Sequence, residues 1–476
     1  MGKTTGFLEH RRAFPDKRPV HERINDFSEI ERLFDERTLE IQASRCMECG
    51  VPFCHSFGCP LNNRIPDFND LLYRKKWQKA CELLHETNNF PEITGRICPA
   101  PCETACTLAV NGEAVTIRQI ELGLVEQGWK SGWIRPLLAP FKTGRKIAVI
   151  GSGPAGLAVA QQLVRAGHTV VVYERDSKPG GLLRFGIPDF KLEKWILDRR
   201  LRQLKAEGVT FETTVCAGSD LSVKYLKRSF DAIVLAAGST TPRDLRVPGR
   251  DLQNVHFAMD LLTQQNHLID NEAIPLNTII SAKGKNVAII GGGDTGADCV
   301  GTCRRQGAKE IFQLEILPQP PAERPESNPW PQWPQTMRTG TSHEEGCKRF
   351  WAVNIKEFLE KNNTLSGLRA VAVEWGLSQE GKPPSFKEKP GSEFTLNVDM
   401  AVLAMGFIHV EHGPLVKDLD LATDSRGNIV LDKNSMTSHP GVFAAGDCVS
   451  GASLVVRAVV DGRKTAAMVD AYVKKL

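Results

Sequence analysis

Seven of the chain's 13 cysteines fall in two short stretches of its first quarter, a density that indicates a metal or redox site. Residues 46–59 read CMECGVPFCHSFGC, and residues 98–106 read CPAPCETAC. Disulfides, zinc and iron–sulfur clusters could each use such cysteines. A structural zinc site usually takes ligands from C-x2-C pairs, and here only Cys46 and Cys49 have that spacing. Mixed spacings suit cubane clusters, whose iron atoms face several directions, so the pattern favours iron–sulfur ligation.

The N-terminal sequence and the composition weigh against disulfides and against several classes of protein. The opening residues MGKTTGFLEHRRAF lack the apolar core of a secretion signal. No apolar run reaches the roughly 18 residues of a membrane span. We therefore expect a cytoplasmic protein without a membrane partner, in a compartment where structural disulfides are rare. A net charge of +4 over 476 residues gives no support to nucleic-acid binding.

The remaining six cysteines form no candidate redox-active pair. Cys299 and Cys303 have the i,i+4 spacing of one helix face and are predicted to be packing residues, as is Cys81 in an earlier helix. The other three stand alone in the sequence: Cys216, Cys347 and Cys448.

The elements around the cysteine stretches are predicted to be helical. Segments such as SEIERLFDERTLEIQ and DFNDLLYRKKWQKACELLHETN read as helices, and no strand-like run precedes about residue 145. We expect a helical domain over residues 1–143, with PLLAPFKTGR at 136–145 as the linker out of it.

Two copies of a strand, glycine turn, helix and strand follow this linker. KIAVIGSGPAGLAVAQQLVRAGHTVVVYER begins at residue 146, and KNVAIIGGGDTGADCVGTCRRQGAKEIFQLEIL begins at residue 285. The G-x-G-x-x-G spacing permits a tight turn, the approach of a pyrophosphate and close packing of the helix on the strand. An acidic residue after the second strand accepts hydrogen bonds from the ribose hydroxyls. The sequence therefore predicts two dinucleotide-binding units. Their predicted site residues are Gly151, Gly153, Pro154, Ala155, Gly156, Glu174 and Arg175 in the first, and Gly291, Gly293, Asp294, Thr295, Gly296 and Glu315 in the second.

The second unit carries conflicting signals about its nicotinamide coenzyme. Glu315 favours the free 2′-hydroxyl of NADH and repels a 2′-phosphate. Arg304 and Arg305 could hold the 2′-phosphate of NADPH, or they could be solvated helix residues. The sequence leaves the choice between NADPH and NADH open.

Three short motifs resemble the FAD-binding segments of disulfide-reductase-like flavoproteins: GSGPAG at 151–156, LAAG at 235–238 and FAAGD at 443–447. The resemblance implies that 144–250 and 408–476 bind FAD and that 251–407, inserted between them, binds NAD(P)H. It assigns further FAD contacts to Gly181, Leu182, Gly238, Gly446 and Asp447. With the helical domain in front, the predicted fold class is α/β, with two Rossmann-like domains after an α-helical iron–sulfur domain.

The cysteine region resembles the N-terminal domain of glutamate synthase small (β) subunits, which is also found in dihydropyrimidine dehydrogenase. The matching text is RCMECGVPFC, GCPLNNRIPDFNDLLYR and NNFPEITGRICPAPCETAC, and the likeness extends over nearly the whole chain. It implies two interleaved 4Fe-4S clusters. The first cluster site would comprise Cys46, Cys49, Cys54 and Cys106, and the second cluster site Cys59, Cys98, Cys102 and, from VTIRQIELG at 115–123, Glu121.

The same resemblance implies a function and a partner. NAD(P)H would reduce FAD, with no catalytic protein acid or base, and the clusters would carry electrons to a large (α) subunit that makes L-glutamate from glutamine and 2-oxoglutarate. Residue 2 is glycine, so we expect no N-terminal cysteine nucleophile and no glutamate formation by this chain alone. The alternatives are a free-standing reductase of ferredoxin or a small acceptor, and a zinc-bound scaffold.

Residues 318–335, PQPPAERPESNPWPQWPQ, are too rich in proline for a helix or a central strand. Two interpretations stay open: a rigid surface loop, or a cover over a cofactor or partner site, anchored by Trp330 and Trp333.

Overall fold

The computed structural model describes residues 2–376 and 385–476, and its first part is helical, as predicted. Asp35 caps one helix by accepting a hydrogen bond from the Thr38 amide at 2.7 Å. Gly95 lets two helices cross closely, because a Cβ there would lie 2.8 Å from the Leu122 Cβ. The elements are α1 (Gly6–Glu9), α2 (Val20–Arg23), α3 (Glu36–Ser44), η1 (Cys54–Gly58), α4 (Ile65–Tyr73), α5 (Trp77–Thr87), α6 (Pro91–Ile97), α7 (Pro101–Thr104), η2 (Thr107–Val110) and α8 (Ile117–Lys130).

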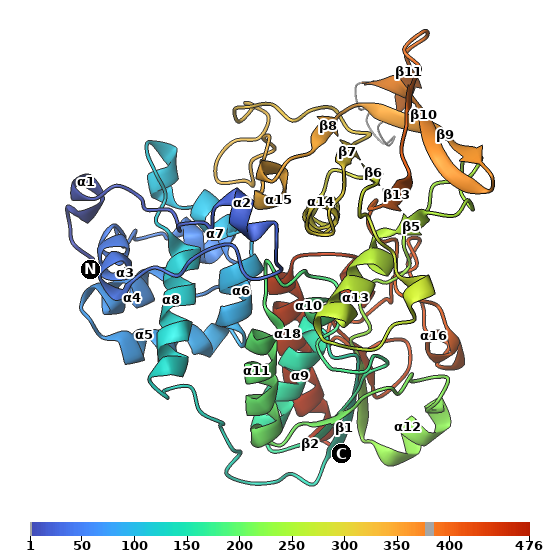
Figure 1. Ribbon diagram of the computed structural model, residues 1–476. Coiled ribbons are helices and arrows are strands. Elements are labelled where there is room, and N and C mark those ends of the chain that lie inside the picture. The colour runs from blue at the N-terminus through green and yellow to red at the C-terminus, as the bar shows by residue number, and fades with distance from the viewer. Residues whose placement is uncertain (1, 377–384) are drawn as a thin grey trace.

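A parallel sheet of order β14-β4-β1-β2-β3 follows the helical part. Figure 1 shows two of its strands, β1 and β2, near α9, α11 and α18. The residues of β1 after Lys146 are all buried, as expected of a strand covered on both faces. The strands are β1 (Lys146–Ile150), β2 (Thr169–Tyr173), β3 (Thr210–Glu212), β4 (Ala232–Leu235) and β14 (Val442–Ala444). The helices are α9 (Pro154–Arg165), α10 (Leu182–Phe185), α11 (Lys194–Glu207), α12 (Val223–Ser229), α16 (Pro414–Asp418), α17 (Asp447–Ser450) and α18 (Val455–Val473).

A second parallel sheet, of order β5-β13-β6-β7-β8, repeats this plan. Because β14 joins the first sheet only after the second is complete, the second fold is inserted in the first, as predicted. Its strands are β5 (Val255–Phe257), β6 (Asn286–Ile290), β7 (Glu310–Leu314), β8 (Lys348–Phe350) and β13 (Met400–Leu403). Its helices are α13 (Ala258–Ile269), η3 (Leu276–Thr278), α14 (Asp294–Arg305) and α15 (Thr341–Glu344).

An antiparallel sheet packs against the second fold, and our reading of the sequence missed it. It contains β9 (Val353–Lys361), β10 (Thr364–Trp375), β11 (Phe386–Glu388) and β12 (Phe394–Leu396). Asn362 and Asn363, with φ of 55° and 59°, turn β9 into β10. Two consecutive residues of positive φ are the mark of a type I′ hairpin, and asparagine tolerates them well.

Buried ion pairs join the three parts of the molecule. Arg200 on α11 binds Glu92 on α6 through two contacts of 2.6 and 2.7 Å, and neither side chain is exposed. Glu345, after α15, accepts from both Arg23 on α2 and Arg305 on α14. Since buried pairs need well-aligned geometry to offset desolvation, these contacts fix how the parts meet.

Candidate cluster and dinucleotide sites

The four cysteines of the first cluster site line one cavity. Cys46 follows α3, Cys54 begins η1 and Cys106 precedes η2, so three local turns bring the thiols together. Burial raises the pKa of Cys46 to about 11 and that of Cys54 further, since desolvation disfavours a thiolate. Thiols crowded in this way become good ligands once a positively charged group stabilises their thiolate form, and this donor set fits an iron–sulfur cluster.

The second cluster site draws on the other three cysteines and Glu121. The charge of Glu121 contributes to the raised pKa values of Cys59, Cys98 and Cys102, which places all four groups near one another. Gly58 permits this approach, because a Cβ there would lie 2.7 Å from the Cys102 Cα. Both sites therefore take cysteines from both stretches of sequence, in the grouping that the resemblance implies.

Glu121, on α8, is buried among polar side chains at the second cluster site. Burial raises its pKa to about 7, against hydrogen bonds that favour the charged form. Its Oε1 accepts from Asn88 at 2.7 Å and from Thr94, and its Oε2 accepts from Asn63 at 3.4 Å. A buried carboxylate beside three thiols is a chemically suitable fourth ligand for a cluster.

Within residues 2–376 and 385–476, no three histidine, cysteine or acidic side chains lie close enough together to hold a single metal ion. The four thiols of the first cluster site surround a cavity instead. Each of the 13 cysteines, all of which are described, is a free thiol, and Cys81, Cys299 and Cys303 are buried among packing residues, as predicted.

The first glycine turn lies between β1 and α9. Gly151 has φ of +100°, and a Cβ there would lie 2.4 Å from the Ala236 carbonyl oxygen. Gly153, in contrast, faces open space, which fits the approach of a phosphate to the helix N-terminus. Glu174, after β2, accepts from the Ser152 amide at 3.0 Å, so the predicted acid lies beside the turn.

The other predicted FAD contacts surround this turn. Gly181 packs against it, because a Cβ there would lie 2.9 Å from the Gly153 Cα. Leu182 is 39% exposed, Gly238 faces open space, and Asp447 begins α17, where burial raises its pKa. Arg175 lies further out and pairs with Glu411 at 3.0 Å on the surface.

The second glycine turn, between β6 and α14, reproduces the first. Gly291 has φ of +128°, and Gly293 faces open space. Glu315 accepts from the Gly292 amide at 2.7 Å and from the Leu317 amide at 2.8 Å. Asp294 and the following Thr295 begin α14, so the predicted residues gather at the N-terminus of that helix.

Arg304 and Arg305 are not available to a 2′-phosphate, which corrects that interpretation of the sequence. They end the 12-residue helix α14, about 17 Å of helix from the glycine turn at its start. The Arg305 side chain is fully buried and paired with Glu345, and its guanidinium lies 3.9 Å from the centre of the Phe190 ring. Arg304 donates to the carbonyls of Gly346 and Ala308.

The proline-rich segment 318–335 contains neither helix nor strand, as predicted, and it reaches the first cluster site. The rings of Trp330 and Phe53 lie 4.7 Å apart, and Phe53 lines the cavity next to Cys54. Trp330 therefore anchors the segment against the wall of a candidate cofactor site. Trp333 instead lies under the Arg338 guanidinium, 3.7 Å from it.

Several polar residues of the two cluster sites were not predicted from the sequence. Asn63, Asn88 and Thr94 hold Glu121, and Asn69 lines the first cluster site. For Asn69 a signal existed, since it shares the inward face of α4 with buried Ile65, Phe68 and Leu72. A polar residue within an apolar stripe of helical period marks a position that faces either a partner group or a ligand.

Comparison with known proteins identifies the class of protein to which the chain belongs. Residues 145–462 match the family model of pyridine nucleotide-disulphide oxidoreductases, and residues 23–133 match dihydropyrimidine dehydrogenase domain II, 4Fe-4S cluster. Mycobacterium tuberculosis FprA in complex with NADPH shares the fold, with a TM-score of 0.56 at 17% identity over 70% of this chain and 85% of that one. The chain is thus an oxidoreductase with this fold and a 4Fe-4S domain.

Two relatives give the particular family. The glutamate synthase (NADPH) small chain of Mycobacterium tuberculosis is 49% identical over 99% of this chain and 96% of its own length. The glutamate synthase (NADH) of Schizosaccharomyces pombe is 42% identical over 99% of this chain, which spans 23% of that protein. The chain belongs to the family of glutamate synthase small chains. Within the described ranges, no helix is both long and apolar enough to cross a bilayer.

Proposed function

We propose that this chain is the subunit through which electrons enter a glutamate synthase. It oxidises NADPH or NADH and passes electrons through FAD and two 4Fe-4S clusters to a large (α) subunit, which forms L-glutamate from glutamine and 2-oxoglutarate. FAD supplies the exchange between a hydride and single electrons, and the clusters supply one-electron transfer. The observation that carries the proposal is the pair of interlocked thiol sites beside two dinucleotide turns.

The cofactors divide among three domains. Residues 144–250 and 408–476 hold FAD, with the open Gly153 at the pyrophosphate and Glu174 at the ribose. Residues 251–407 hold the nicotinamide coenzyme in the same way with Gly293 and Glu315, and residues 1–143 hold the clusters. The protein's contribution is to position the two coenzymes, and no side chain acts as a catalytic acid or base.

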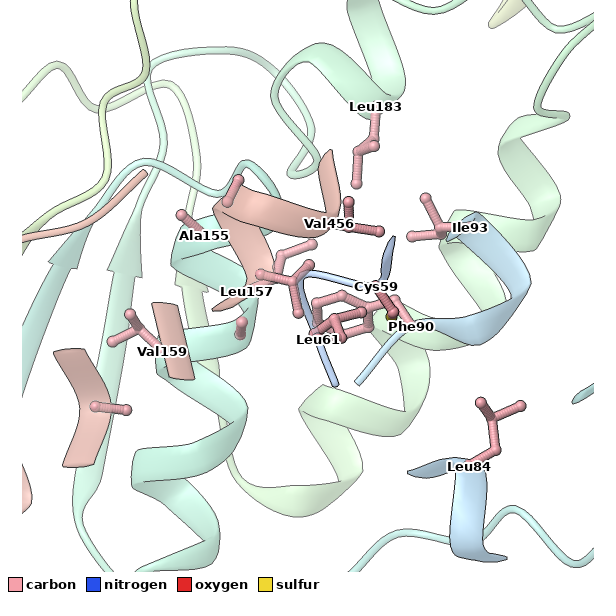
Figure 2. Packing of buried hydrophobic residues seen from close by; sticks show 14 of the residues in the cluster. Cys59, Leu61, Leu84, Phe90, Ile93, Ala155, Leu157, Val159, Leu183 and Val456 are labelled. Atoms are coloured by element: carbon pink, nitrogen blue, oxygen red, sulfur yellow. The ribbon is translucent and has the colours of Figure 1, made fainter. Parts of the chain in front are cut away.

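The second cluster site adjoins the FAD fold. Asn88 binds Glu121, and the next residue, Asn89, donates to Gln161 on α9 at 2.6 Å and accepts from Arg463 on α18 at 2.7 Å. Figure 2 shows Cys59 beside Leu61 and Phe90, with side chains of α9 and α18 next to them. This site is therefore the one that receives electrons from FAD.

The first cluster site includes a surface-exposed turn. Val51, which precedes Pro52 in the wall of the cavity, is 68% exposed, and Cys49 is half-buried, as is Cys98 of the second cluster site. With FAD and both clusters bound, the second cluster site would accept electrons from FAD, and the first cluster site would pass them on to the large subunit. In the fission-yeast relative, the region similar to this chain is 23% of one longer protein, which supports a partner that supplies the rest of the reaction.

The test is a reconstitution with two readouts. The purified chain should oxidise NADPH or NADH with ferricyanide as electron acceptor and should form no glutamate from glutamine and 2-oxoglutarate. Addition of a purified large subunit should start glutamate formation at the expense of the same nicotinamide. Coenzyme oxidation that never couples to glutamate would instead assign a free-standing reductase of ferredoxin or a small acceptor.

A further inference from the structure

Asn69 is a buried polar residue without a partner in the first cluster site. It lies on α4, is 0% exposed and lines the cavity between Cys46, Cys49, Cys54 and Cys106. Neither its Nδ2 nor its Oδ1 has a hydrogen-bond partner within the part of the chain that the structure describes. Its side chain lies beside the Cys46 thiol, with which it makes only a weak hydrogen-bonding contact.

An unpaired amide in this position is costly. More than about 90% of buried polar groups are hydrogen-bonded, and an unpaired one costs about 1–3 kcal/mol. The neighbours of Asn69 on the inward face of α4 are apolar, as are Val115 and Ile117 across the cavity. A leucine at this position would therefore make the folded protein more stable, unless a group bound in the cavity accepts hydrogen bonds from the amide.

We propose that Asn69 donates an N–H to a sulfur atom of the cluster bound in the first cluster site, and that this bond raises the cluster's reduction potential. The proposal rests on the proposed function, because it needs a cluster in that site. Reduction adds negative charge to the cluster sulfurs, so a hydrogen bond to them is stronger in the reduced state. Hydrogen bonds to sulfur are one of the terms that set cluster potentials.

The second cluster site carries the same number of anionic ligands, because Glu121 takes the place of a fourth thiolate. The three side chains that donate to Glu121 direct their hydrogens at its carboxylate. The Asn69 donor would therefore make the first cluster site easier to reduce than its four thiolates alone would.

The test replaces Asn69 with leucine, which matches its size and lacks its donors. Wild-type and variant chains are purified anaerobically, and both cluster potentials are measured by a redox titration followed by electron paramagnetic resonance. In Asn69→Leu, one cluster should become about tenfold harder to reduce, a 59 mV negative shift for one electron, while the other stays unchanged. Asn286→Leu, which removes a half-buried amide at the start of β6, is the control and should shift neither potential.

Several outcomes are distinguishable. Unchanged potentials in Asn69→Leu with full iron content would overturn the proposal, as would a positive shift. If Asn69→Leu does not assemble its clusters, Asn69→Asp is measured, since it keeps the shape and replaces the donor with a carboxylate oxygen. That variant should also shift the potential of one cluster negatively, and an unchanged value would overturn the proposal. A wild-type chain without cluster signals would refute the proposed function itself.

Discussion

The ion pair of Glu92 with Arg200 joins the cluster domain to the FAD fold, and its removal should have a large effect. Burial raises the pKa of Glu92, but the charge and hydrogen bonds of Arg200 outweigh it and hold that pKa below its ordinary value. Both side chains are 0% exposed, with contacts of 2.6 and 2.7 Å. Glu92→Gln leaves the guanidinium buried without its counter-charge, and such a loss costs about 3–5 kcal/mol.

The assay is equilibrium unfolding in urea, followed by tryptophan fluorescence and by circular dichroism. Glu92→Gln should lower the free energy of unfolding by about 3–5 kcal/mol, whereas the double variant Glu92→Leu/Arg200→Met should recover most of that loss, since it leaves no charge buried. Glu357→Gln, which breaks a half-exposed pair with Arg369, should change stability little. A loss under about 1 kcal/mol in Glu92→Gln, or a double variant worse than both single variants, would refute this reasoning.

Three further predictions follow from single residues. Cys59→Ala should lose about half of the iron and keep FAD, because only the second cluster site depends on that thiol. Glu315→Ala should lower the KM for NADPH relative to that for NADH, since the carboxylate that repels a 2′-phosphate is gone. Burial lowers the pKa of His85 to about 4, with a further contribution from Arg200. The unfolded chain thus gains a proton at His85 below about pH 6.5 that the folded one does not, so between pH 7 and pH 5 the wild type should lose about 2 kcal/mol more stability than His85→Gln.

Each of these three predictions has an outcome that would contradict it. Full iron content in Cys59→Ala would disprove its assignment to a cluster. An unchanged ratio of KM values in Glu315→Ala would remove that side chain from the ribose site. A loss of stability in acid that is as steep in His85→Gln as in the wild type would show that other groups cause it. Unfolding is measured in urea at both pH values.

The sequence contained enough to predict the fold and the dinucleotide turns. Gly151, Gly291 and the acids Glu174 and Glu315 obey local spacing rules, and the structure gathers them as those rules require. The hairpin of β9 and β10 was also readable from its Asn362 turn, but that signal was overlooked.

Contacts between residues far apart in sequence could not be predicted in this way. Arg305 meets Glu345 across 40 residues, and Trp330 meets Phe53 from another domain, so no local pattern reports either contact. Two adjacent arginines at a helix end fit a phosphate site and a buried ion pair equally well in sequence. Only the packing of α2, α14 and α15 around Glu345 distinguishes them.

The central claim is that this one chain holds a flavin and two interlocked clusters. The most direct measurement is the content of iron, acid-labile sulfide and FAD per chain after anaerobic purification. We expect about eight iron atoms, about eight sulfides and about one FAD per chain, with no zinc. About four iron atoms, or zinc in place of iron with no sulfide, would contradict it.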